Sequence, residues 1–91
     1  MSVFDQVYPR RNTNSLKWDK MEKVYNMEDA SDLLAMWVAD MDFAPPQAVL
    51  DALHKRLDHP IFGYSLINDD CRDAIVSWFR RRHNWIIDPN T

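Results

Sequence analysis

The sequence has 91 residues, of which 46% are hydrophobic and 12% aromatic, and its formal net charge is −3. This length allows one small domain at most, the composition is too apolar for a disordered segment, and the charge gives no overall positive field that would attract nucleic acid or anionic lipid. A chain this short usually needs disulfides, a metal or a partner, yet it has a single cysteine. We therefore expect this chain to be part of a larger protein. We also expect that protein to be cytoplasmic and to have no membrane span, since no window of the sequence approaches the roughly 20 apolar residues that a span needs.

Residues 1–20 show neither the helical nor the strand period. Polar residues and a proline are mixed there with isolated aromatic side chains, Phe4, Tyr8 and Trp18. The backbone and the rings of such a segment have few local partners, so it is stable only on another surface. We predict an extended N-terminal arm over residues 1–20, lying on another part of a longer protein or on a second subunit.

An irregular stretch and then an apolar run follow the arm. Residues 21–32 are irregular or weakly helical, and residues 33–39 have the length and composition of a buried strand. The run stops at Asp40 and Asp42. Two carboxylates this close suit Mg²⁺ or Mn²⁺, but without a third ligand the pair is more typical of capping and loop hydrogen bonds. We expect no metal site.

Two helices are predicted in the rest of the chain. Pro46 suits a first helical turn, where a missing N–H is tolerated, and apolar residues at helical spacing then predict a helix to about Leu57. The second helix is capped by Asn68 or Asp69 and ends in the basic residues 80–83, which complement the helix dipole. Its apolar stripe consists of Cys71, Ala74, Ile75, Trp78 and Phe79.

The loop between these helices contains the one glycine of the chain, Gly63. Glycine reaches positive φ without steric cost, so its position before Tyr64 predicts a turn that aims this ring. After the second helix, residues 85–87 are predicted to be extended and residues 88–90 to form a turn.

Other chemistry is weakly indicated. The three histidines have no zinc-ligand spacing, and a single glycine cannot build a phosphate-binding loop. Cys71 lies on the apolar side of its helix, which predicts a buried small hydrophobe and not an exposed nucleophile. The tryptophans favour packing over the stacking of bases or sugars.

Four motifs resemble the start of the MalY/PatB-type cystathionine β-lyases, in the class I/II aminotransferase superfamily. The most specific is Ala39-Asp40-Met41-Asp42-Phe43, because the wider superfamily tends to a Gly-x-Pro-Asp-Phe form there. Asn12 stands where relatives often have glycine, a departure that concerns the turn in the arm. The four motifs are residues 11–19, residues 37–43 with Pro46, residues 61–65, and Trp78-Phe79 with Arg82-His83 and Trp85.

The resemblance implies an α/β parent of fold type I, in which this segment is mainly α-helical with an extended arm and short strand-like stretches. Residues 21–91 would form part of the small domain and the entry into the large cofactor-binding domain. The parent would be a homodimer that binds pyridoxal phosphate and cleaves cystathionine or cysteine-like substrates to a thiol, pyruvate and ammonia, within methionine and cysteine metabolism.

The resemblance also implies the roles of single residues. Tyr64 matches a tyrosine that reaches the phosphate of the partner subunit's cofactor, and Ala39 and Asp40 match the segment that lines the substrate entrance. The Schiff-base lysine and the other catalytic residues are expected outside this segment. Two alternatives stay open: an aminotransferase of the same superfamily, and a non-enzymatic helical module that binds a partner through its aromatic residues.

Overall fold

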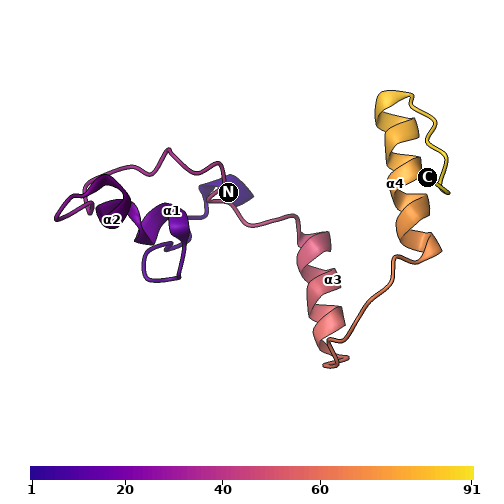
Figure 1. The fold of residues 1–91 in the computed structure, drawn as a ribbon, viewed down its shortest axis with the longest axis horizontal. Coiled ribbons are helices and arrows are strands. Elements are labelled where there is room, and N and C mark those ends of the chain that lie inside the picture. The colour runs from indigo at the N-terminus through magenta and orange to yellow at the C-terminus, as the bar shows by residue number, and fades with distance from the viewer. The chain divides into compact units, whose positions relative to one another are not determined.

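The computed structural model describes residues 1–91 and divides them into two units, Met1–Lys55 and Arg56–Thr91. The chain forms one short 3₁₀ helix, η1, four α-helices, α1 to α4, which Figure 1 labels, and no strand. The elements are η1 (Val3–Asp5), α1 (Leu16–Asp19), α2 (Met21–Tyr25), α3 (Gln47–Leu57) and α4 (Asp69–His83). No helix has the length and apolarity that crossing a membrane requires.

The two longer helices confirm the sequence patterns. Helix α3 begins one residue after Pro46, and the Pro46 carbonyl accepts a 2.9 Å hydrogen bond from the backbone N–H of Val49. Helix α4 is capped by Asn68, whose side-chain oxygen accepts a 2.9 Å hydrogen bond from the backbone N–H of Cys71. It ends at His83, and the C-cap residue Asn84 adopts a left-handed conformation with φ of 49°. Local signals are sufficient for both helices because caps and apolar spacing act within a few residues.

The first unit has a small core built around α1 and α2. Met21, Ala30 and Ala35 are buried, and Trp18, Met27 and Trp37 pack against them. The indole N–H of Trp37 donates a 2.9 Å hydrogen bond to the backbone carbonyl of Lys17. The core therefore joins residues 30–37 to the two short helices.

A turn within residues 11–14 leads into α1. Asn12 and Asn14 have φ values of 60° and 61° there, and asparagine tolerates this left-handed region better than most residues. Asp19 closes the turn by accepting hydrogen bonds from the backbone N–H groups of Asn12 at 2.7 Å, Thr13 at 3.0 Å and Ser15 at 3.1 Å. These hydrogen bonds lower the pKa of Asp19, and the bond from the backbone of Asn12 has the largest effect. Residues 1–20 thus contain η1, this turn and α1 between their irregular stretches.

Three local predictions differ from the structure. Residues 33–39 form no strand, because a strand needs a partner strand and no segment of this chain supplies one. Gly63 does not adopt positive φ, so the predicted glycine turn before Tyr64 is wrong. Cys71 is exposed and not buried, since nothing in the chain packs over it.

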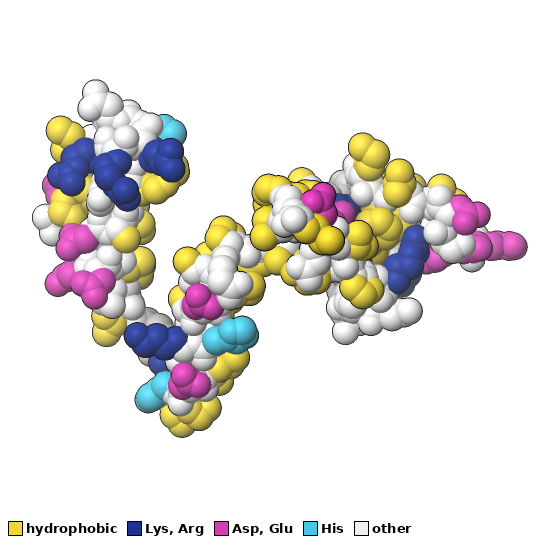
Figure 2. Space-filling model, turned by 180° about the vertical axis from the view of Figure 1, so that it is seen from behind, with side chains coloured by type: hydrophobic (Ala, Val, Ile, Leu, Met, Phe, Trp, Pro, Cys, Tyr) yellow, Lys and Arg dark blue, Asp and Glu magenta, His cyan; other side chains and the backbone are white.

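Apolar side chains of α3 and α4 lie at the surface of the segment. Leu53 and Leu57 on α3, and Ile75 and Trp78 on α4, are all exposed. In Figure 2 hydrophobic side chains are visible along both helices, between charged ones. The hydrophobic stripes that the spacing predicted are present, and they remain exposed within these 91 residues.

Candidate functional site

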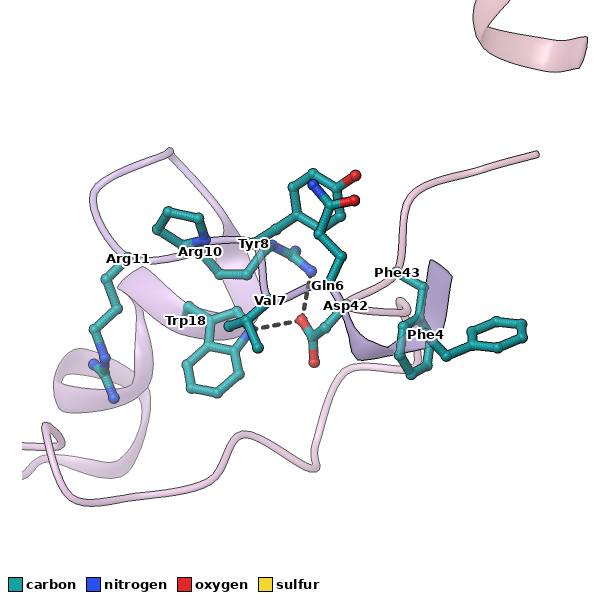
Figure 3. A pocket seen from close by; sticks show the side chains of 10 residues that line it. Phe4, Gln6, Val7, Tyr8, Arg10, Arg11, Trp18, Asp42 and Phe43 are labelled. Atoms are coloured by element: carbon teal, nitrogen blue, oxygen red, sulfur yellow. Dashed lines mark hydrogen bonds and ion pairs between the residues drawn. The ribbon is translucent and has the colours of Figure 1, made fainter. Parts of the chain in front are cut away.

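Asp42 is the centre of a group of charged and polar side chains in the first unit. Its Oδ1 accepts a 2.8 Å hydrogen bond from the indole N–H of Trp18 and a second from Nη1 of Arg10 (Figure 3). Its Oδ2 accepts a 2.9 Å hydrogen bond from Nζ of Lys17. Arg10 precedes α1, and the other two donors lie in α1. Asp42 therefore fixes α1 and the segment before it to the loop that follows the core.

Asp40 takes part through its side chain and its backbone. Nη2 of Arg10 lies 2.8 Å from Oδ2 of Asp40, and Nζ of Lys17 donates a 2.8 Å hydrogen bond to the Asp40 carbonyl oxygen. Nη1 of Arg10 also donates a 3.0 Å hydrogen bond to the carbonyl of Met41. We call Arg10, Lys17, Trp18, Asp40 and Asp42 the carboxylate network.

Lys17 is the one buried charged residue of the chain, with 7% of its surface exposed. An unpaired buried ammonium group would be strongly destabilising. Here its charge faces Asp42 at 2.9 Å and the Oδ1 atom of Asp40 at 4.0 Å. Two cations, Arg10 and Lys17, thus balance two carboxylates, so the network is neutral as a whole.

The network acts on the protonation of Asp42. The pKa of Asp42 is lowered below its ordinary value. The largest cause is the hydrogen bond from the indole of Trp18, followed by the hydrogen bond and charge of Lys17 and by the charge of Arg10. Each of these interactions favours the charged form of the carboxyl group. The network therefore favours the ionised form of Asp42, which suits its part as an anchor.

An open groove of about 470 Å³ lies beside the network. Arm residues form much of its lining, and the rings of Phe4 and Phe43 meet edge to face with centroids 5.2 Å apart. Its polar lining comes from Gln6, Arg10, Arg11, Trp18 and Asp42, as Figure 3 shows. The groove is thus mostly apolar, and two of its lining residues, Arg10 and Asp42, are ion-paired with each other.

The structure brings some predicted site residues together. Ala39 is exposed and directly precedes Asp40, which lies in the carboxylate network. The hydrogen bonds expected for Asp40 and Asp42 are confirmed, and no group of three or more His, Cys, Asp or Glu side chains could hold a metal ion. Tyr64 lies in the second unit, and its side chain is fully exposed.

Sequence reasoning missed the partners of these carboxylates. Arg10 and Lys17 lie in the predicted arm, where their positive charges had no assigned acceptor. The available signal was charge: the arm carries four cations, Arg10, Arg11, Lys17 and Lys20, and two carboxylates follow the apolar run. Charge balance alone does not specify which cation pairs with which acid.

No sequence-family model matches the chain. It is 44% identical over 88 residues to "Cystathionine beta-lyase PatB" of Bacillus subtilis (strain 168), covering 97% of this chain and 22% of that protein. It is 37% identical over 92 residues to "Protein MalY" of Escherichia coli (strain K12), covering all of this chain and 23% of that protein.

Solved structures agree with these relatives. The crystal structure of the pyridoxal-phosphate-bound C-S lyase from Staphylococcus hominis matches with a TM-score of 0.76 and 36% identity, over 93% of this chain and 21% of that one. The same lyase complexed with the inhibitor L-cycloserine matches with a TM-score of 0.81 and 32% identity, over 93% and 23%.

These similarities define the class of protein: the chain matches the N-terminal segment of fold-type I lyases whose structures were solved with pyridoxal phosphate bound. More narrowly, the chain belongs to the MalY/PatB-type family of carbon-sulfur lyases and corresponds to its N-terminal portion. It spans about a fifth of the length of the relatives that it matches.

Proposed function

We propose that the full-length protein carrying this segment is a pyridoxal-phosphate-dependent carbon-sulfur β-lyase. It would convert cystathionine and water to homocysteine, pyruvate and ammonia, and would act in the same way on cysteine-like substrates. The observation that carries the proposal is the 44% identity to a cystathionine β-lyase along nearly the whole chain. The Ala39–Phe43 motif, which is the most family-specific stretch, lies within that match.

The segment's own residues fit a contact to the cofactor. The Tyr64 side chain is fully exposed and no hydrogen bond occupies its hydroxyl group, so a phosphate oxygen could accept one. Phenol hydroxyl groups donate well to charged acceptors. Tyr64 would therefore anchor the phosphate group, and in a homodimer it would do so at the partner subunit's site.

Lys17 is a poor choice for the lysine that bonds to the cofactor, because its Nζ is held by Asp42 and by the Asp40 carbonyl. The other lysines, Lys20, Lys23 and Lys55, are exposed. The Schiff-base lysine is therefore proposed to lie beyond residues 1–91. When bound, pyridoxal phosphate supplies an electron sink for the carbanion that forms at the substrate α-carbon.

The segment would contribute to substrate binding through Ala39 and Asp40. The exposed Ala39 precedes a residue whose side chain and carbonyl are both fixed, so the backbone here is held in one arrangement. We assign these two residues to the rim of the substrate entrance. The parent protein is proposed to be a homodimer, as the family resemblance implies, and to be cytoplasmic, and the segment itself to be inactive.

One relative favours a second candidate function. The chain is 29% identical over 75 residues to "LL-diaminopimelate aminotransferase" of Aquifex aeolicus (strain VF5), covering 79% of this chain. An aminotransferase of the same superfamily would transfer the substrate amino group to a 2-oxo acid instead of eliminating a thiolate.

The first test addresses the cofactor. The full-length protein is incubated with pyridoxal phosphate, reduced with borohydride, digested and weighed. We expect one phosphopyridoxyl group per chain, on a lysine outside residues 1–91. Absence of any adduct would contradict cofactor dependence, and an adduct on Lys17 would contradict the assignment of that residue to the carboxylate network.

A further inference from the structure

The carboxylate network raises an electrostatic question about the proposed substrate entrance. Amino acid substrates carry a carboxylate, and the entrance is proposed to lie at Ala39 and Asp40. Two protein carboxylates, Asp40 and Asp42, occur in that short stretch, and both are more than a third exposed, at 46% and 38% of their side-chain surface. Left uncompensated, they would repel an approaching anion.

Arg10 and Lys17 remove this repulsion. Arg10 contacts both acids, with Nη2 at 2.8 Å from Asp40 and Nη1 bonded to Asp42, and its side chain is only 22% exposed. Lys17 contacts Asp42 at 2.9 Å and holds the Asp40 carbonyl at 2.8 Å. The same two side chains therefore neutralise the acids and fix the backbone that carries Ala39.

We propose that Arg10 and Lys17 are positioning residues of the substrate entrance, which make the stretch from Ala39 to Asp42 receptive to a substrate carboxylate. This inference rests on the proposed function. Neither residue needs to touch the substrate. Each acts through Asp40 and Asp42 by cancelling their charge and by holding their backbone.

The test uses the full-length protein loaded with pyridoxal phosphate, and the variant Arg10→Gln. Glutamine keeps much of the length and polarity of arginine but loses its charge, so one carboxylate is left unbalanced. Two readouts are measured. The first is the KM and kcat for cystathionine. The second is equilibrium binding of L-alanine and of L-alanine methyl ester, followed by the cofactor's visible absorbance, since alanine has no β-leaving group to eliminate.

We expect Arg10→Gln to raise the KM for cystathionine on the order of 5-fold while kcat changes little, as one added charge at several ångströms would do. The affinity for alanine should fall by a similar factor, and the affinity for its methyl ester should not. Added salt should reduce the defect by screening the unbalanced charge. Lys17→Met should act in the same direction and also lower stability, because Lys17 is buried.

Arg56→Gln is the matched control. Arg56 also donates a side-chain hydrogen bond, at 2.8 Å to the Ile61 carbonyl, but it lies in the second unit and contacts neither acid. Its KM should equal that of the wild type. Equal loss of affinity for alanine and its ester in Arg10→Gln, or no loss for either, would overturn the inference. If the wild-type protein neither binds the cofactor nor cleaves cystathionine, the proposed function itself fails and the inference fails with it.

Discussion

Lys17 and Asp42 are 25 residues apart in the chain, and a 2.9 Å hydrogen bond joins Nζ of the first to Oδ2 of the second. This bond connects the first short helix to the loop that follows the core. It explains how a segment with three buried apolar residues still fixes the position of its most family-specific motif. The loop is held by ion pairs and hydrogen bonds and to a lesser degree by packing.

Acid should weaken this connection. The pKa of Asp42 is lower in the folded protein than the unfolded value of about 3.9. A carboxyl group shifted in this direction contributes stability above its unfolded pKa, and that contribution is lost as the pH falls through the folded pKa. Asp42→Asn should therefore lower stability at neutral pH and reduce its loss below about pH 4.

The measurement is the urea midpoint of the full-length protein against pH, for wild type and Asp42→Asn. Asp32→Asn serves as control, because Asp32 is exposed, lies outside the helices and makes no side-chain hydrogen bond or ion pair. If the curves of wild type and Asp42→Asn run parallel from neutral pH to about pH 3, the ion pairs of Asp42 do not contribute to stability.

A substitution at Trp37 tests how the core of the first unit is stabilised. Its indole N–H donates to the Lys17 carbonyl at 2.9 Å, and its ring meets Tyr25 edge to face at 5.6 Å. Trp37→Phe should keep most of the aromatic contact and lose the hydrogen bond, at a cost of about 0.5 to 1.5 kcal/mol. Chemical unfolding of the full-length protein would measure it, and an unchanged midpoint would show that water replaces the lost donor without penalty.

Substitutions at Asn68 test the N-terminal cap of helix α4. Asn68→Ala removes the acceptor for the backbone N–H of Cys71, 2.9 Å away, and should destabilise the protein by about 0.5 to 2 kcal/mol. Asn68→Ser should recover most of this loss, because serine is an equally good N-cap. Hydrogen exchange at the amides of the first turn of α4 localises the effect. Equal protection in the alanine and serine variants would argue against a capping role.

How far the sequence predicts this structure depends on the range of the interactions. Helices α3 and α4 follow from Pro46, from Asn68 and from apolar spacing, all of which act locally. The Ala39–Phe43 motif identified the family because it departs from the form of the wider superfamily. These are short patterns, so they can be found without knowing the fold.

Long-range contacts were not predictable in the same way. Arg10 bonds to residues 30 and 32 positions later, and no local pattern specifies that pairing. The apolar run 33–39 has the composition of a buried strand, but strand formation depends on a partner. Burial of Cys71 likewise depends on packing partners, which the pattern of α4 implies but does not supply within this chain.

Tyr64 is proposed to hold the cofactor phosphate of the partner subunit. Tyr64→Phe removes only the hydroxyl group, so affinity for pyridoxal phosphate should fall roughly 10- to 150-fold, the loss of one hydrogen bond to a charged acceptor. The chemical step should change less, because the phosphate is an anchor. Titration of the apo full-length protein measures the affinity, and Tyr25→Phe is a control that makes the same change at another tyrosine.

Subunit mixing separates the two possible locations of this contact. Dimers are formed between Tyr64→Phe chains and chains whose Schiff-base lysine is replaced. If Tyr64 acts on the partner, the one site with an intact lysine keeps the tyrosine of the other chain and binds the cofactor normally. A defect in that site would show that the contact is made within one subunit.

The most direct test of the proposed function is the fate of cystathionine with the full-length protein and pyridoxal phosphate. We predict that homocysteine and pyruvate are released in equal amounts, without any need for a 2-oxo acid acceptor. An aminotransferase would instead consume an added 2-oxo acid and leave the carbon-sulfur bond intact. Transfer of the amino group without release of thiol, or no reaction at all, would contradict the assignment as a carbon-sulfur β-lyase.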